Sequence, residues 1–219
     1  MRPLYYYQFN DPETFNATDE YFWGDQFLVA PVMTQGATSR KVYLPEGQWY
    51  RFSDNKLLNG KQWLDQPAEL AYLPLYAKAG SFVPLWQTDS VIRSTEAYDS
   101  KNISMLYYPG NTSSYTWYDD DGKEPRALER AEYELITFTG STKGDKVTIE
   151  IKTNNPAAYK RKQVRKFTIL IPEAAIKAVT VNGTDAKTVA ARPVMLAAGK
   201  FAATTIVFDG KPTTVEIKL

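Results

Sequence analysis

The apolar residues of this chain fall into short runs of strand length, each ended by residues that favour turns. Phe27–Ala30 is stopped by Pro31, and Val147–Ile151 alternates apolar and polar side chains. Turn signals separate such runs at spacings of about ten residues, a pattern typical of antiparallel sandwiches. With 219 residues, the chain is long enough for one or two domains with their own cores. We therefore expect an all-β fold of two consecutive antiparallel β-sandwich domains.

Thirteen segments are predicted as strands, and three turns carry specific signals. Leu44–Gly47 and Asn59–Gly60 are predicted to turn hairpins, the first of them leading into the strand at Trp49, and Asn182–Gly183 is a further hairpin signal. The predicted strands are Gln26–Ala30, Lys41–Leu44, Trp49–Phe52, Leu70–Leu73, Phe82–Leu85, Ile103–Tyr108, Tyr115–Tyr118, Tyr133–Phe138, Val147–Ile151, Lys166–Ile171, Ala178–Val181, Thr205–Phe208 and Thr214–Leu219. One helical turn is expected at Glu173–Lys177.

Three regions differ in composition. Residues 1–22 are rich in tyrosine, and Asp11 followed by Pro12 predicts the start of a short helix. Residues 23–92 and 93–219 are the two predicted sandwiches, and the polar stretch Gln87–Ser100 is the expected linker.

The composition excludes several classes of function. The chain has no Cys and no His, which removes disulfides, thiolate zinc sites and Ser-His hydrolases. The net charge of +1 argues against a nucleic-acid partner. No run of apolar residues is long enough to span a membrane, and no signal peptide is visible. We expect no cofactor, and the compartment stays open.

The sharpest acidic cluster is Asp119–Asp121, followed by Gly122. Oxygen ligands suit Ca²⁺, but the spacing of an EF-hand is missing, so a solvated turn is the favoured interpretation and no metal site is predicted. Candidates for a glycosidase pair within this chain are Asp25, Asp54, Asp65 and Glu69, by residue type only. We expect these to be strand-end or surface carboxylates.

Two further groups of residues could bind a ligand. The cations Lys160, Arg161, Lys162, Arg165 and Lys166 could form a polyanion patch, but a loop or charged edge strand is favoured. The indoles of Trp49, Trp63, Trp86 and Trp117 could stack on sugar rings, although core packing is favoured.

Several segments resemble, in order, the region that follows the catalytic barrel in family-31 glycoside hydrolases, the α-glucosidase and α-xylosidase family. They are MRPLYYYQFNDPET, FWGDQFLVAPV, GATSRKVYLPEGQWYRF, LPLYAKAGSFVPL and, for the distal domain, SYTWYDDDG. The resemblance covers most of residues 1–140. Lys78 departs from it, because the family carries Arg there, and Asp25 matches its Gly-Asp, where we expect hydrogen bonds to backbone N–H groups.

The resemblance implies a C-terminal accessory part of a retaining α-glucosidase. It implies that residues 1–22 are the remnant of a (β/α)8 barrel, that the chain begins inside a longer protein, and that both catalytic aspartates lie upstream. No catalytic residue is therefore assigned, and the chain alone is expected to be inactive. Residues 1–22 are expected to be disordered, rearranged or packed on another chain. The expected partners are the barrel and, through it, carbohydrate. A carbohydrate-binding module, an α-xylosidase parent and an adhesion domain are the alternatives.

Overall fold

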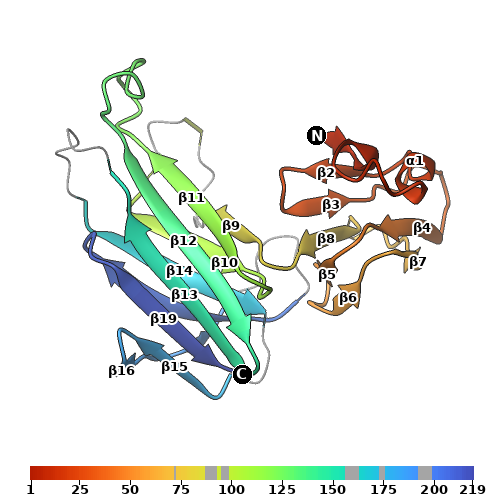
Figure 1. The fold of residues 1–219 in the computed structure, drawn as a ribbon. Coiled ribbons are helices and arrows are strands. Elements are labelled where there is room, and N and C mark those ends of the chain that lie inside the picture. The colour runs from red at the N-terminus through yellow and green to blue at the C-terminus, as the bar shows by residue number, and fades with distance from the viewer. Residues whose placement is uncertain (72, 87–92, 95–98, 156–162, 173–175, 192–198) are drawn as a thin grey trace.

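The computed structural model describes two β-sandwiches that lie side by side, the first holding the N-terminus and the second the C-terminus (Figure 1). The described residues are 1–71, 73–86, 93–94, 99–155, 163–172, 176–191 and 199–219. Among them, no helix is long and apolar enough to cross a membrane. The strand-like periodicity of the sequence thus becomes an all-β fold, as predicted.

The first sandwich packs a six-stranded sheet against a strand pair. Leu28, Val42, Trp49 and Tyr76 are buried between these two layers. The sheet has the order β1 (Arg2–Pro3), β2 (Tyr21–Trp23), β3 (Phe27–Val29), β8 (Leu75–Lys78), β5 (Gln48–Arg51) and β6 (Leu57–Asn59), and the pair is β4 (Ser39–Leu44) with β7 (Gln62–Pro67).

The hairpin predicted at Leu44–Gly47 is wrong. β4 pairs with β7, while β5 pairs with β6 and β8, so the turn carries the chain from one layer to the other. Gly47 has φ 127°, and the Trp49 indole N–H donates to the Pro45 carbonyl at 2.9 Å. The turn chemistry was recognised correctly, but the indole bond fixes a crossing between layers instead of a return along the same sheet.

Two further predictions about this region are wrong. The turn at Asn59–Gly60 also changes layer, since its flanking strands β6 and β7 pair with different partners. The strand predicted at Leu70–Leu73 is also wrong, because Leu70 is fully exposed in a turn. Tyr72 lies outside the described residues. The strand in this part of the chain is β7, which comes before that segment. The sequence pattern does not predict β7, because its buried side chain is polar: Gln66 accepts a hydrogen bond from the Tyr76 hydroxyl at 2.8 Å inside the core.

The N-terminal segment packs on its own chain, which corrects the expectation of disorder or of a foreign partner. β1 pairs with β2, and Leu4 and Ala17 are buried in the same core as Trp49. A 3-10 turn (Leu4–Tyr6) and a short helix, α1 (Glu13–Asn16), follow β1. The helix begins where Asp11 and Pro12 predicted it, and the Asp11 carboxylate accepts the Glu13 backbone N–H at 3.3 Å.

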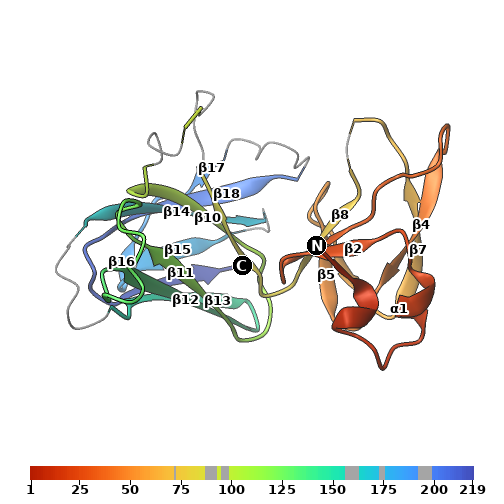
Figure 2. The ribbon, with the colours of Figure 1, turned by 90° about the horizontal axis from the view of Figure 1, so that it is seen from above.

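The two sheets of the second sandwich lie one above the other, as the view from above shows (Figure 2). An aliphatic and aromatic core is buried between them. Its buried members include Phe138, Ile149, Phe167 and Val215. One sheet has the order β17 (Val189–Ala190), β18 (Phe201–Phe208), β14 (Arg165–Pro172), β10 (Asn102–Tyr107) and β9 (Phe82–Leu85); the other has the order β11 (Ser113–Asp119), β12 (Glu134–Lys143), β13 (Lys146–Thr153), β19 (Thr213–Lys218), β15 (Ala178–Val181) and β16 (Thr184–Asp185).

The strands predicted for this half are all present, and the pairing is antiparallel apart from β10 with β14. Asn182 and Gly183 turn the β15–β16 hairpin with φ of 51° and 77°, as their sequence predicted. The helical turn expected at Glu173–Lys177 lies largely outside the described residues.

A third apolar cluster joins the two sandwiches. Phe27, Phe52 and Ala77 of the first meet Tyr108 and Leu170 of the second. β9 lies within residues 23–92, which are predicted as the first sandwich, yet it is paired with β10 in the second. The expected linker falls mostly outside the described residues, and the boundary near residue 92 stays a prediction.

Candidate functional site

The N-terminal segment exposes five aromatic side chains within eleven residues. Tyr5, Tyr6, Tyr7, Phe9 and Phe15 have exposed fractions of 45, 65, 42, 69 and 54%. Tyr5 stacks on Phe15 with ring centroids 5.3 Å apart, and Tyr6 meets Tyr7 edge-on at 5.3 Å. These five residues are named the N-terminal aromatic surface. An apolar group of this kind on a folded domain is typical of an interaction site.

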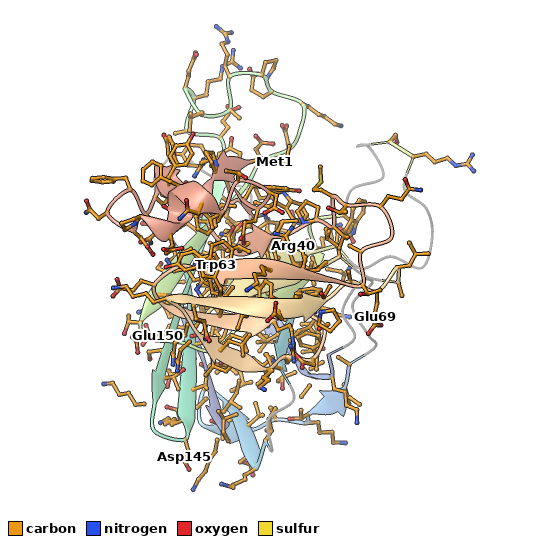
Figure 3. All side chains as sticks on the ribbon, turned by 90° about the vertical axis from the view of Figure 1, so that its right-hand side faces the viewer. Met1, Arg40, Trp63, Glu69, Asp145 and Glu150 are labelled. Carbon is orange, nitrogen blue, oxygen red and sulfur yellow. The ribbon has the colours of Figure 1, made fainter. Side chains whose placement is uncertain are left out.

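Two carboxylates fasten this surface to the strand pair β4–β7. The Tyr43 hydroxyl donates to Asp11 at 2.6 Å, and the Trp63 indole N–H donates to Glu13 at 2.8 Å. Tyr43 and Trp63 are directly opposite in register, and Trp63 lies on the strand pair that faces the viewer in Figure 3. Partial burial, followed by the Asp11 carboxylate, raises the pKa of Tyr43, so its hydroxyl stays a donor. The aromatic surface is therefore held in a fixed place.

Asp25 lies beside this surface and binds side chains, which corrects the expectation of backbone partners. Its carboxylate accepts the Arg2 guanidinium at 3.1 Å and the Tyr7 hydroxyl at 2.9 Å. Asp25 and Tyr7 also line a small pocket with Trp49 and Lys78. Asp25 thus joins β1 to the β2–β3 turn.

The three aspartates Asp119–Asp121 serve separate purposes. Asp119 is buried, while Asp120 accepts the Tyr118 hydroxyl at 2.8 Å and the Gly122 N–H at 2.7 Å. Asp121 caps the following turn by accepting the Lys123 N–H at 2.9 Å. Within the part of the chain that the structure describes, no group of three acidic side chains is arranged to hold a metal ion.

Arg165 corrects the interpretation of the basic run as a loop or edge. β14 is a central strand, and the Arg165 guanidinium is buried between the sheets with both Asp119, at 2.5 Å, and Glu134. It also lies over the Trp117 ring, 5.3 Å from its centroid. Residues 160–162 of the run lie outside the described residues. The network ties the two sheets of the second sandwich together.

The carboxylates weighed as a glycosidase pair lie on different elements. Asp54 is bonded to Arg51 in the turn after β5, which lowers the pKa of Asp54, and Asp65 is opposite Lys41 on the β4–β7 pair. Glu69 lies beyond the end of β7, apart from Trp63 (Figure 3). Each is a surface carboxylate on a separate element, as predicted.

Glu20 is a buried carboxyl that sequence reasoning missed. Its Oε1 accepts the Tyr43 backbone N–H at 2.8 Å, its Oε2 has no partner, and Arg40 lies 4.0 Å away. Burial raises the pKa of Glu20 to about 7. Arg40 itself is bonded to Asp19 and to the Pro31 carbonyl, so this group anchors the loop before β4.

The tryptophans divide between core and surface. Trp49 and Trp117 are buried, and Trp86 is half-buried. Trp63 is 37% exposed, and Trp23, which is not among the four predicted candidates, is 60% exposed. Core packing is therefore the role of Trp49 and Trp117, as favoured.

Comparison with known proteins connects this fold to one family. Residues 1–83 match the family model described as glycosyl hydrolase family 31 C-terminal domain. The chain is 32% identical over 186 residues to α-glucosidase 2 of Bacillus thermoamyloliquefaciens, covering 84% of this chain and 23% of that protein. It is 29% identical over 150 residues to an α-xylosidase of Saccharolobus solfataricus, covering 68% and 20% of the two.

A solved structure matches the whole chain. The family-31 dextranase of Flavobacterium johnsoniae, complexed with isomaltotriose, superposes with a TM-score of 0.81 at 26% identity, covering all of this chain and 29% of the dextranase. The chain thus spans between a fifth and about a third of the length of these proteins.

Proposed function

This chain is a C-terminal region of the family-31 glycoside hydrolases, and on that premise we propose that it is the part of a retaining α-glucosidase that supports the catalytic barrel. The observation that carries the proposal is the N-terminal aromatic surface. Its five rings lie within the segment matched by the family model, and they are exposed although their backbone is anchored. A supporting domain needs such a fixed apolar face for the barrel.

The chemistry of this surface suits packing between domains of one protein. Interfaces inside a chain have apolar anchors with a polar rim. Here Tyr6, Phe9 and Phe15 supply the anchors, and the Arg2–Asp25 ion pair lies at the edge. The barrel packed on this face would supply the two aspartates that attack the anomeric carbon and protonate the leaving group, with net retention.

The proposed substrate is a terminal, non-reducing α-linked glucose. The α-glucosidase is matched over more of the chain and at higher identity than the α-xylosidase, and the dextranase in the structural match holds an oligomer of glucose. An α-xylosidase parent is the alternative, and xyloside hydrolysis by the parent enzyme would favour it.

In the experiment, this chain replaces the matching C-terminal region of the Bacillus α-glucosidase, which gives a chimera with the Bacillus catalytic part. The chimera is expected to be soluble and to hydrolyse 4-nitrophenyl α-glucoside, whereas the isolated chain is not. Changing Phe9 and Phe15 together to Ser in the chimera is expected to abolish soluble, active protein. The matched control is Val207→Ser, since Val207 is equally exposed but lies on β18 in the second sandwich.

Two results would overturn the proposal. One is a chimera with Phe9 and Phe15 changed that is as active and heat-stable as the unchanged chimera. The other is turnover by the isolated chain that disappears when one of its own carboxylates is changed.

A further inference from the structure

A second aromatic site lies on the outer face of the β11–β12 pair, in the other sandwich. Tyr118 is 40% exposed, and its ring stacks on that of Tyr133 with centroids 5.2 Å apart and an interplanar angle of 27°. The Tyr118 hydroxyl donates to Asp120 at 2.8 Å. Stacking on Tyr133 and a hydrogen bond at the tip hold the ring in place, so a ligand that contacts its exposed part costs little further rotamer freedom.

Hydroxyl side chains extend from this ring along the sheet. Thr116 lies one outward position before Tyr118 and faces Thr137, with their oxygens 3.1 Å apart. The next outward row pairs Ser114 with Thr139. Between these rows, Trp117 and Phe138 point into the core, so the outer face carries two rows of hydroxyls and then a row with Tyr118 and Leu135.

The side chains of this outer face favour a sugar over a protein as the ligand. A protein interface core is built from several apolar anchors. Here the residue directly across the strands from Tyr118 is the apolar Leu135, and the next two outward rows of β11 and β12 carry hydroxyl side chains. A pyranose ring has an apolar C–H face that covers an aromatic ring and a rim of hydroxyls that exchange hydrogen bonds with Thr and Ser. Lys152 and Glu150 follow on β13, opposite Thr137 and Thr139, and are paired with each other at 2.6 Å.

We propose that Tyr118, with Thr116 and Thr137, forms a surface site for an α-linked glucose oligosaccharide. The ring of Tyr118 stacks on one sugar, and the hydroxyl rows contact the next ones along the sheet. The site is separate from the N-terminal aromatic surface, and it would hold a glucan chain near the enzyme without cleaving it. The choice of glucose rests on the proposed function; the site itself rests on the geometry of β11 and β12.

The test uses the 219-residue chain in native gels containing dextran, together with calorimetric titration of isomaltotriose. The chain is expected to be retarded by dextran and to bind isomaltotriose with a Kd on the order of 1 mM. Tyr118→Ala is expected to weaken binding by at least roughly tenfold. Thr116→Val, which keeps the shape of the side chain, is expected to weaken it less. Tyr6→Ala is the matched control, because Tyr6 is an exposed tyrosine of the first sandwich, and it is expected to bind like the unchanged chain.

Three results would overturn this inference. They are the absence of dextran retardation, equal binding by Tyr118→Ala, and loss of binding in Tyr6→Ala in place of Tyr118→Ala. The melting temperature of each variant checks that it is folded, and Thr116→Val provides a second reading should Tyr118→Ala unfold. An active chimera together with absent dextran binding would refute the Tyr118 site and not the proposed function. Dextran binding together with an inactive chimera would refute the proposed function and not the site.

Discussion

Removing the buried cation of the second sandwich should destabilise it far more than removing a surface cation. In Arg165→Met, an unbranched side chain replaces the aliphatic part of the arginine, and Asp119 and Glu134 lose their common partner. Asp119 is only 7% exposed and Glu134 only 3%, so water cannot replace the guanidinium without opening the sheets. Leaving buried charge unpaired costs about 3–5 kcal/mol.

Urea unfolding followed by tryptophan fluorescence measures this loss, since Trp117 lies beneath the guanidinium. With a urea slope of about 2–3 kcal/mol per M, the midpoint of the second sandwich should fall by roughly 1–2 M. Arg130→Met is the matched control. Its ion pair with Glu124 is solvent-exposed and should be worth less than about 1 kcal/mol.

A triple variant separates charge from packing. Adding Asp119→Asn and Glu134→Gln to Arg165→Met removes the orphaned charges and is expected to restore at least half of the lost stability. A loss in Arg165→Met no larger than that in Arg130→Met would refute the reasoning.

Two further predictions concern Glu20 and Gly140. The pKa of Glu20 is raised from its ordinary value of 4.5 to about 7, so its neutral form stabilises the first sandwich fully below pH 4.5, and that contribution is lost as the pH rises through 7. The total is about 3 kcal/mol; melting curves between pH 5 and 8 should show the decline, and Glu20→Gln should remove it, whereas an unchanged slope would contradict the assignment. Gly140→Ala would place a methyl group 2.5 Å from the Tyr107 ring and should lower the free energy of unfolding in urea by about 1–3 kcal/mol. Gly144→Ala is the comparison, because no atom lies within 4 Å of the added methyl group. Its cost should come only from the positive φ of that residue.

The all-β architecture was predictable because strand periodicity is local. Val147–Ile151 and the closing strand alternate regularly, and the structure places their apolar members in one core. The pairing of β4 with β7 was not predictable, since the Pro45–Gly47 turn specifies a change of direction but not the layer that the chain enters next.

The burial of charged side chains could not be predicted from the sequence either. Arg165 belongs to a run of cations and looks solvated, yet its partners Glu134 and Asp119 lie 31 and 46 residues away along the chain. The apolar character of residues 1–15 was visible in the sequence. Their attachment through Asp11 and Glu13 was not, because it requires Tyr43 and Trp63 to lie opposite each other on paired strands.

The apolar cluster that joins the two sandwiches has a consequence for how such modules can be inherited. Phe27, Phe52 and Ala77 cover Tyr108 and Leu170 of the neighbouring sheet, so each half completes the surface of the other. A recombination event that moved one half to a new gene would leave an exposed apolar patch on both products. Selection should therefore keep the two together as one heritable block, and single-half copies should persist only where polar residues have replaced this cluster.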